Sequence, residues 1–184
     1  MRTKFACLGL ILFIFLAGCG GPKVDVPIFM MSTSGIPSEV GDKLEADLQA
    51  KTGATPTIKI QTTPIFSMEK LVVEIAAGDN GIIVVPMDQF KALGQQGGYI
   101  NLDAIANSED FPEGVLELPV DNKDNKDKTD KTVKTEKHLY GIPLEKTKWF
   151  TDLKLNGKNL VAFVPANAQK QDMVTQVLKV IAQK

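Results

Sequence analysis

The segment Gly81-Ile82-Ile83-Val84-Val85-Pro86 constrains the fold more than any other part of this sequence. Its four central residues are all apolar and β-branched, and such residues favour an extended, pleated backbone. Because no polar residue interrupts the run, neither face of the strand suits contact with water. This pattern is typical of a parallel strand that is covered on both faces. The sequence therefore predicts a sheet with a packed layer on each side.

Strands and helices alternate along the first hundred residues. The predicted strands cover residues 24–31, 57–62 and 81–86, and apolar residues at helical spacing predict a helix after each strand. Pro37 suits the first turn of the first helix, and Ser67 is a candidate cap of the second. This order predicts an α/β fold with a single doubly wound sheet and right-handed crossovers.

The last third of the chain is less regular. Residues 121–137 mix Asp and Lys and predict a solvated loop. A calcium loop is excluded there, because lysines occupy positions where oxygen ligands are needed. Residues 138–144 are predicted as a strand. The dipeptide Asn156-Gly157 between two apolar runs predicts a C-terminal hairpin over residues 148–164. A final helix is predicted over residues 169–184.

The first residues have the pattern of an export signal. Arg2 and Lys4 supply positive charge, and an apolar run follows from Phe5 to Leu16. Small residues then precede a cysteine in Leu16-Ala17-Gly18-Cys19. A positive start, an apolar core and a small-residue cleavage site indicate a signal peptide, and the core is too short to span a bilayer.

The tetrapeptide that ends at Cys19 resembles the lipobox of bacterial lipoproteins. This resemblance implies that the Cys19 sulfur is diacylated, with chains such as palmitate, before cleavage. We expect a signal peptide at 1–18, a lipidated tether at 19–23 and a single α/β domain at 24–184. Several acyl chains would hold the domain firmly at the extracytoplasmic face of the cell membrane. An ordinary secreted protein and an N-terminal membrane anchor are the alternatives.

Composition narrows the class of partner. Loss of Arg2 and Lys4 with the signal leaves 19 basic residues against 22 acidic ones, so nucleic acid is not an expected partner. Arg2 is the only arginine, and a bidentate grip on carboxylate or phosphate is therefore excluded from the mature chain. Cys7 leaves with the signal too, so no internal disulfide can form.

The sequence does not favour an enzyme, and we expect neither a cofactor nor a metal. His138 is the single histidine, and Cys19, the one cysteine left after cleavage, is the expected lipidation site and not a thiol that His138 could activate. The chain has no Gly-x-Ser-x-Gly segment of the kind that presents a nucleophilic serine. A His and Cys metal cluster cannot be assembled from one residue of each kind.

The stretch from Val24 to Leu144 resembles the first lobe of extracellular solute-binding proteins, the sugar-type receptors of bacterial ABC importers. The resemblance rests on the order and spacing of several short motifs. These are Glu74-Ile75-Ala76-Ala77-Gly78, the strand Ile82 to Val85, Phe90, Leu93, Gly97-Gly98, Leu102-Asp103, and His138-Leu139-Tyr140-Gly141-Ile142-Pro143. It implies a periplasmic-binding-protein-like lobe, a sugar or other small polar solute as ligand, and an ABC permease as partner.

The chain also departs from that family. Family members usually have two lobes that enclose the solute, whereas about 40 residues follow Pro143 here, too few for a second lobe. Asp79-Asn80-Gly81 stands where the family usually has Pro-Asp before the third strand. We therefore expect a single lobe, closed off by its own C-terminal segment, that cannot close around a ligand.

Candidate ligand-binding residues follow the ends of the three predicted strands, where α/β sheets present ligands. Hydroxyls, a carboxylate and aromatic faces suit a sugar. The candidates are Ser32, Thr33, Ser34, Thr63, Phe66, Ser67, Asp88 and Trp149. For Ser34, Ser67 and Asp88 the alternative role is a helix cap. For Trp149 it is a place in the core.

Two further roles compete with solute binding. The chain can use the receptor-like lobe as a scaffold that binds a protein partner, which predicts an exposed apolar patch and no deep pocket. It can also be a truncated product without an independent role. The sequence names neither the ligand nor the oligomeric state.

Replacement of Cys19 by alanine tests the lipid anchor. We expect the Cys19→Ala chain to take up no labelled palmitate and to leave the detergent phase on Triton X-114 partitioning, because the acylated sulfur is missing. Cys7→Ala is the matched control, since Cys7 lies inside the apolar core of the signal. Equal labelling of the Cys19→Ala and unaltered chains would contradict the lipobox.

Overall fold

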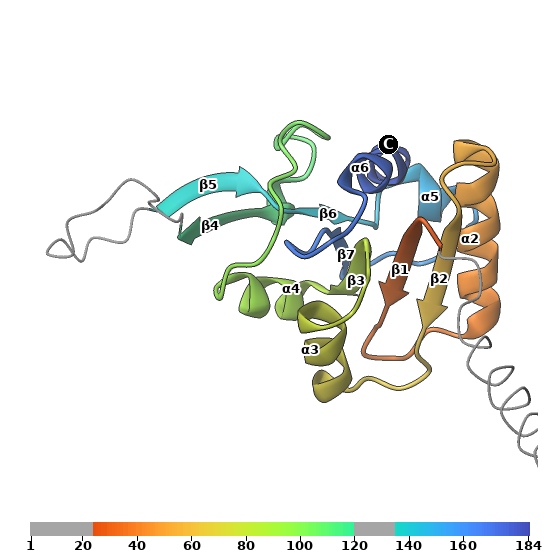
Figure 1. Ribbon diagram of the computed structural model, residues 1–184, viewed down its shortest axis with the longest axis horizontal. Helices are drawn as coiled ribbons and strands as arrows, with labels where there is room; N and C mark the ends of the chain where they lie inside the picture. The colour runs from red at the N-terminus through yellow and green to blue at the C-terminus, as the bar shows by residue number, and fades with distance from the viewer. Residues whose placement is uncertain (1–23, 120–134) are drawn as a thin grey trace, which may run out of the picture.

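A five-stranded mixed sheet forms the centre of the computed structural model, which describes residues 24–119 and 135–184 (Figure 1). The strand order is β2-β1-β3-β7-β6, in which β1 is parallel to β2 and β3, while β7 is antiparallel to β3 and β6. The five strands are β1 (Val26–Met30), β2 (Ile58–Thr62), β3 (Ile82–Pro86), β6 (Gly141–Pro143) and β7 (Leu160–Phe163).

Some expectations fall outside the described residues. They are the signal peptide at 1–18, the lipidated Cys19 with its tether at 19–23, and residues 121–134 of the charged segment. Within the described ranges, no helix has the length and apolar character needed to cross a membrane.

Helices pack on both faces of the sheet, so the predicted α/β architecture is confirmed. Side chains alternate along β1 and the residue that follows it: Ile28 and Met30 join one core, and Phe29 and Met31 join the other. The first core includes side chains from α2 (Ser38–Thr52), α5 (Lys148–Thr151) and α6 (Gln171–Ile181). The second core includes side chains from α3 (Met68–Ala76) and α4 (Met87–Gly94).

The predicted central strand is confirmed as β3, and all five of its residues are buried. Ile82 and Val84 face the first core, and Ile83 and Val85 face the second. Burial of each such side chain contributes about 1.5–3 kcal/mol. The apolar run therefore joins the two cores through one strand.

The predicted C-terminal hairpin is wrong. Lys148–Thr151 forms the short helix α5, and β7 begins only at Leu160. β7 then inserts between β3 and β6 and pairs with both in antiparallel register. Burial accompanies the difference, because the helical turn places the consecutive residues Trp149 and Phe150 together in the first core. The predicted final helix is confirmed as α6.

Trp149 is a core residue, which corrects its prediction as a stacking platform. Its side chain is 0% exposed, and its indole Nε1 donates to the Leu44 carbonyl oxygen at 3.1 Å. The ring also packs edge-on against Phe150, with ring centroids 5.2 Å apart. Trp149 therefore attaches α5 to α2 and offers no face to a solute.

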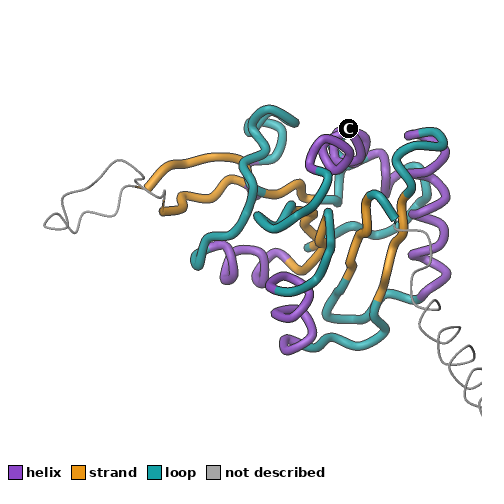
Figure 2. The backbone as a smooth tube through the Cα atoms, in the orientation of Figure 1, coloured by secondary structure: helices purple, strands orange, loops and turns teal. Residues whose placement is uncertain are grey.

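A second, two-stranded sheet extends from the domain (Figure 1). It pairs β4 (Val115–Pro119) with β5 (Thr135–Leu139) in antiparallel register. Residues 135–137 were predicted as loop, but they pair with β4 in this sheet. A long segment without regular strands or α-helices joins α4 to β4 and includes the 3-10 turn η1 (Pro112–Gly114) (Figure 2).

Replacement of Trp149 by alanine tests this core assignment. We expect Trp149→Ala to lower the free energy of unfolding by about 3–5 kcal/mol, because a large buried ring and its hydrogen bond are lost. Thr151→Ala on the same short helix is the control, since Thr151 is exposed and should change stability little. Urea denaturation measures both, and equal midpoints would contradict the assignment.

Candidate functional site

The carboxyl ends of four strands lie along one edge of the sheet. β1, β2 and β3 are mutually parallel, and β6 runs with them because both β3 and β6 are antiparallel to β7. The amino end of β7 consequently reaches the same edge. Ligands of open α/β sheets bind at the carboxyl ends of the strands. Two adjacent hollows open at this edge and share the wall formed by residues 158–160.

The first, which we call the switch-point hollow, has a volume of about 270 Å³. It lies where Met30 ends β1 and Pro86 ends β3. After β1 the chain passes to β2, which lies on one side of β1, and after β2 it crosses to β3, which lies on the other side of β1. Such a reversal of direction is the usual place for a ligand crevice.

Three of the candidate residues line the switch-point hollow, namely Ser32, Thr33 and Ser34. The Ser32 hydroxyl donates to the Gly35 carbonyl oxygen at 2.9 Å and lies 3.3 Å from the Ser34 hydroxyl. Thr33 and Ser34 are exposed. The turn after β1 therefore presents hydroxyl groups to the hollow. Further polar side chains line the hollow, namely Asn156, Lys158 and Asn159.

The other candidates lie elsewhere. Thr63 is buried, and its carbonyl oxygen accepts from the Ile36 amide at 2.9 Å. Ser67 caps α3 by accepting from the Lys70 amide at 3.1 Å. Phe66 packs against the second core.

Two cap assignments also need correction. Asp88 lies in the first turn of α4, after the cap position at Pro86. Ser34 is no cap either, because α2 begins at Ser38 after Pro37. Neither Asp88 nor Trp149 lines a hollow at this edge. The three loops that follow the parallel strands therefore do not converge on one site.

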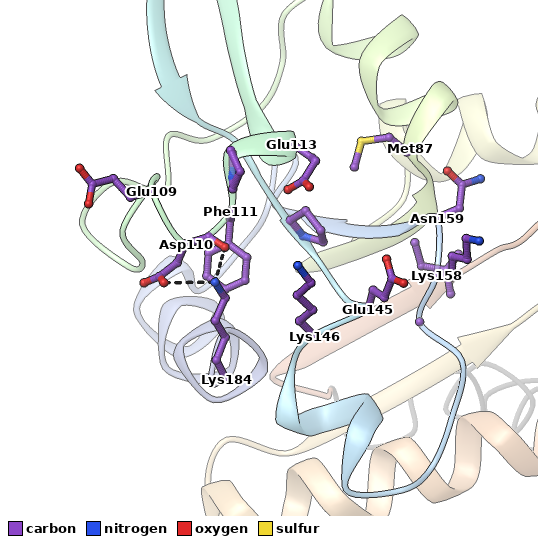
Figure 3. A pocket seen from close by; sticks show the side chains of 14 residues that line it. Met87, Glu109, Asp110, Phe111, Glu113, Glu145, Lys146, Lys158, Asn159 and Lys184 are labelled. Carbon is purple, nitrogen blue, oxygen red and sulfur yellow. Dashed lines mark hydrogen bonds and ion pairs between the residues drawn. The ribbon is translucent and has the colours of Figure 1, made fainter.

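The second, which we call the charged hollow, has a volume of about 420 Å³ and lies beside the ends of β3 and β6 (Figure 3). Its apolar wall includes Met87, Phe111 and Pro143. Seven charged side chains also line it, and none of them is among the predicted ligand-binding residues. They are Glu109, Asp110, Glu113, Glu145, Lys146, Lys158 and Lys184. The sequence feature that could have indicated this hollow is the charged pair Glu145-Lys146, which directly follows the predicted strand over 138–144.

Close backbone packing positions Glu113 in this hollow. The Tyr140 amide donates to the Gly114 carbonyl oxygen at 3.0 Å and holds η1 against β6. A Cβ atom on Gly114 would lie only 1.8 Å from the Gly141 carbonyl oxygen, so glycine is required at this approach. Glu113 therefore stands directly across from the segment that follows β6 (Figure 3).

One pair of charges in the hollow is already satisfied. The Lys184 ammonium lies 3.1 Å from the Asp110 carboxylate and also donates to the Asp110 carbonyl oxygen. The same ammonium lies over the Phe111 ring, 4.8 Å from its centroid. By contrast, Glu113, Glu145, Lys146 and Lys158 have no ion pair within the described ranges, and all four side chains are exposed.

His138 lines a third hollow, and both of its ring nitrogens lie within hydrogen-bonding distance of carboxylates. Nδ1 lies 2.6 Å from the Asp103 carboxylate, and Nε2 lies 3.2 Å from the Glu136 carboxylate. These hydrogen bonds, that to Asp103 first, raise the pKa of His138. Burial opposes ionisation of Asp103, but hydrogen bonds from the Leu139 amide and His138 outweigh it and lower the pKa of Asp103. The cluster thus ties β5 to the irregular segment after α4.

Metal binding has no ready-made site in residues 24–119 and 135–184. No group of three His, Cys, Asp or Glu side chains there is arranged to hold an ion.

Comparison with known proteins gives one distant relative. The chain is 24% identical over 183 residues to the protein named "Putative lipoprotein YteS" of Bacillus subtilis (strain 168). The similarity covers 96% of this chain and 94% of that protein. It supports a lipoprotein and a membrane-anchored location at the cell surface. No protein-family model and no solved structure matches the chain.

The His138 cluster makes stability depend on pH. Because the folded-state pKa of His138 is raised above its ordinary value of 6.5, its contribution is present below pH 6.5 and is lost as pH rises through the folded-state pKa. We expect the melting temperature to fall across this window. His138→Gln should remove this step, and an identical pH profile for the two chains would contradict the cluster.

Proposed function

We propose that this chain is a membrane-anchored extracytoplasmic lipoprotein that binds a small polar solute at the carboxyl edge of its sheet. The observation that carries this proposal is the pair of adjacent hollows at that edge, with a common wall at residues 158–160. Their volumes, about 270 and 420 Å³, suit small molecules. The turn after β1 contributes hydroxyls, and the segment after β6 contributes charges.

The position of the tether is compatible with this role. The described chain begins at Val24, just before β1, and therefore at the amino edge of the sheet. Cys19 is five residues earlier, a distance of at most about 18 Å along an extended chain. A lipid on Cys19 would thus attach the domain by the edge opposite the hollows, leaving the hollows open to solution.

The resemblance to ABC-importer receptors supports solute delivery to a permease as part of the proposal. With a single lobe, a bound solute stays partly exposed, so we expect weaker binding than in a receptor that encloses its ligand. The role that we propose is binding and not catalysis. Both ring nitrogens of His138 are engaged by carboxylates, which leaves neither to act as a base toward a solute.

A second candidate function, binding of a protein partner, is favoured by α3. Its outer face, with the loop before it, exposes apolar side chains, and Ile65 is 76% and Val73 is 60% exposed. Met68 and Val72 extend the same exposed surface. Apolar patches of this kind often mark interaction sites.

A thermal-shift screen of the full-length chain in detergent tests solute binding. We expect a saturable rise of roughly 5–10 °C for a bound solute at a hundredfold excess over its dissociation constant. The double variant Ser34→Ala with Asn156→Ala should weaken binding at the switch-point hollow, since both side chains line it. Ser38→Ala is the matched control, because Ser38 is exposed on α2 and does not line the hollow.

A cooperative melting transition whose midpoint temperature is raised by no solute would contradict solute binding. The second candidate would then be tested by cross-linking in membranes. Val73→Glu should abolish a specific cross-linked product, because it places a charge on the apolar face of α3.

A further inference from the structure

We propose that the charged hollow binds a zwitterionic solute, an α-amino acid or a short peptide. Glu113 and Glu145 would hold its ammonium group, and Lys146 and Lys158 its carboxylate. This inference rests on the proposed solute-binding function and names the chemical class of the ligand at one of its two hollows.

Opposite charges face the same space from different segments of the chain. Glu113 extends from η1, while Glu145 and Lys146 extend from the segment after β6, and all three side chains point into the hollow (Figure 3). Lys158 adds a second ammonium from the loop before β7. Three separate segments of the chain therefore bring carboxylates and ammonium groups to one hollow, and the segment after β6 supplies one of each.

These charges do not neutralise one another in ion pairs. Lys184 is satisfied by Asp110, but no carboxylate of the described residues lies within 4.0 Å of the Lys146 or Lys158 ammonium. Both carboxylates and both ammonium groups are exposed and can make new charged hydrogen bonds without breaking an existing pair. Hydrogen bonds to charged groups are among the stronger polar contacts.

The mixture of signs selects against singly charged ligands. A simple anion would be attracted by the lysines but repelled by Glu113 and Glu145. A simple ammonium ion would be attracted by the two carboxylates but repelled by the lysines. A molecule with one charge of each sign gains both attractions. A neutral polyol gains neither, and its hydroxyls are better matched by the switch-point hollow.

The other lining residues of the hollow determine which further groups a ligand can have. No arginine occurs among the described residues, so a carboxylate would meet lysine ammonium groups, which act as point charges without a fixed fork. Met87, Phe111 and Pro143 form an apolar wall beside the charges. The site therefore favours a class of zwitterions with a small apolar side chain over a single compound.

Isothermal titration of the full-length chain in detergent, with the dipeptide alanyl-leucine as probe, tests this proposal. Three matched probes remove its charges, namely N-acetyl-alanyl-leucine, alanyl-leucine amide and the doubly blocked N-acetyl amide. We expect each singly blocked form to bind about tenfold more weakly than the free dipeptide and the doubly blocked form to bind weakest. Binding should also weaken as salt is raised.

Charge-removing variants assign the effect to the hollow. Glu113→Gln should weaken the free dipeptide about tenfold but leave N-acetyl-alanyl-leucine unchanged, because that probe has no ammonium group. Lys146→Gln should weaken the free dipeptide and leave alanyl-leucine amide unchanged. Glu39→Gln is the matched control, since Glu39 is exposed on α2 and does not line the hollow. In contrast to Glu113, the Glu109 side chain points away from the centre of the hollow (Figure 3).

Equal binding of all four probes, or no binding of any, would overturn the inference. If a neutral sugar shifts the melt and Ser34→Ala with Asn156→Ala abolishes that shift, while the dipeptide fails to bind, the proposed solute-binding function stands and the zwitterion assignment falls. If neither kind of solute binds, both fail.

Discussion

Burial of β3 on both faces is the constraint on which the rest of this structure depends. Ile82 and Val84 must be covered by one layer, and Ile83 and Val85 by another. A strand of this kind is stable only inside a three-layer arrangement, because each exposed apolar side chain would lose about 1.5–3 kcal/mol. Helices α2, α5 and α6 contribute to the layer on one side, and α3 and α4 to the layer on the other.

The antiparallel direction of β7 determines which residues line the candidate binding site at the edge of the sheet. A parallel strand in its place would bring its carboxyl end to the edge, whereas β7 brings its amino end and the loop before it. That loop supplies Lys158 and Asn159 to both hollows. It passes close to the segment after β6, where a Cβ atom on Gly157 would lie 2.7 Å from the Leu144 carbonyl oxygen. The loop before β7 and the first residue of that strand thus form the wall between the two hollows.

The irregular segment after α4 is held in place by polar contacts with distant parts of the chain. Asp103 binds His138 and the Leu139 amide, and Asp110 binds Lys184. These contacts are partly exposed, so each contributes modestly to stability. Together they keep η1 and Glu113 against the sheet edge. The charged hollow therefore depends on groups that are far apart in the sequence.

The sequence by itself determined the elements whose signal is local. The predictions of strand β3, of helices α2, α3 and α6, and of the cap at Ser67 are confirmed. They were possible because hydrophobic periodicity and capping depend on residues only a few positions apart. The tertiary structure alone decided the insertion of β7, the burial of Trp149 and the charged hollow. Trp149 bonds a residue 105 positions away, and Lys184 bonds one 74 positions away. Such partners are chosen by packing of whole layers, which no local pattern encodes.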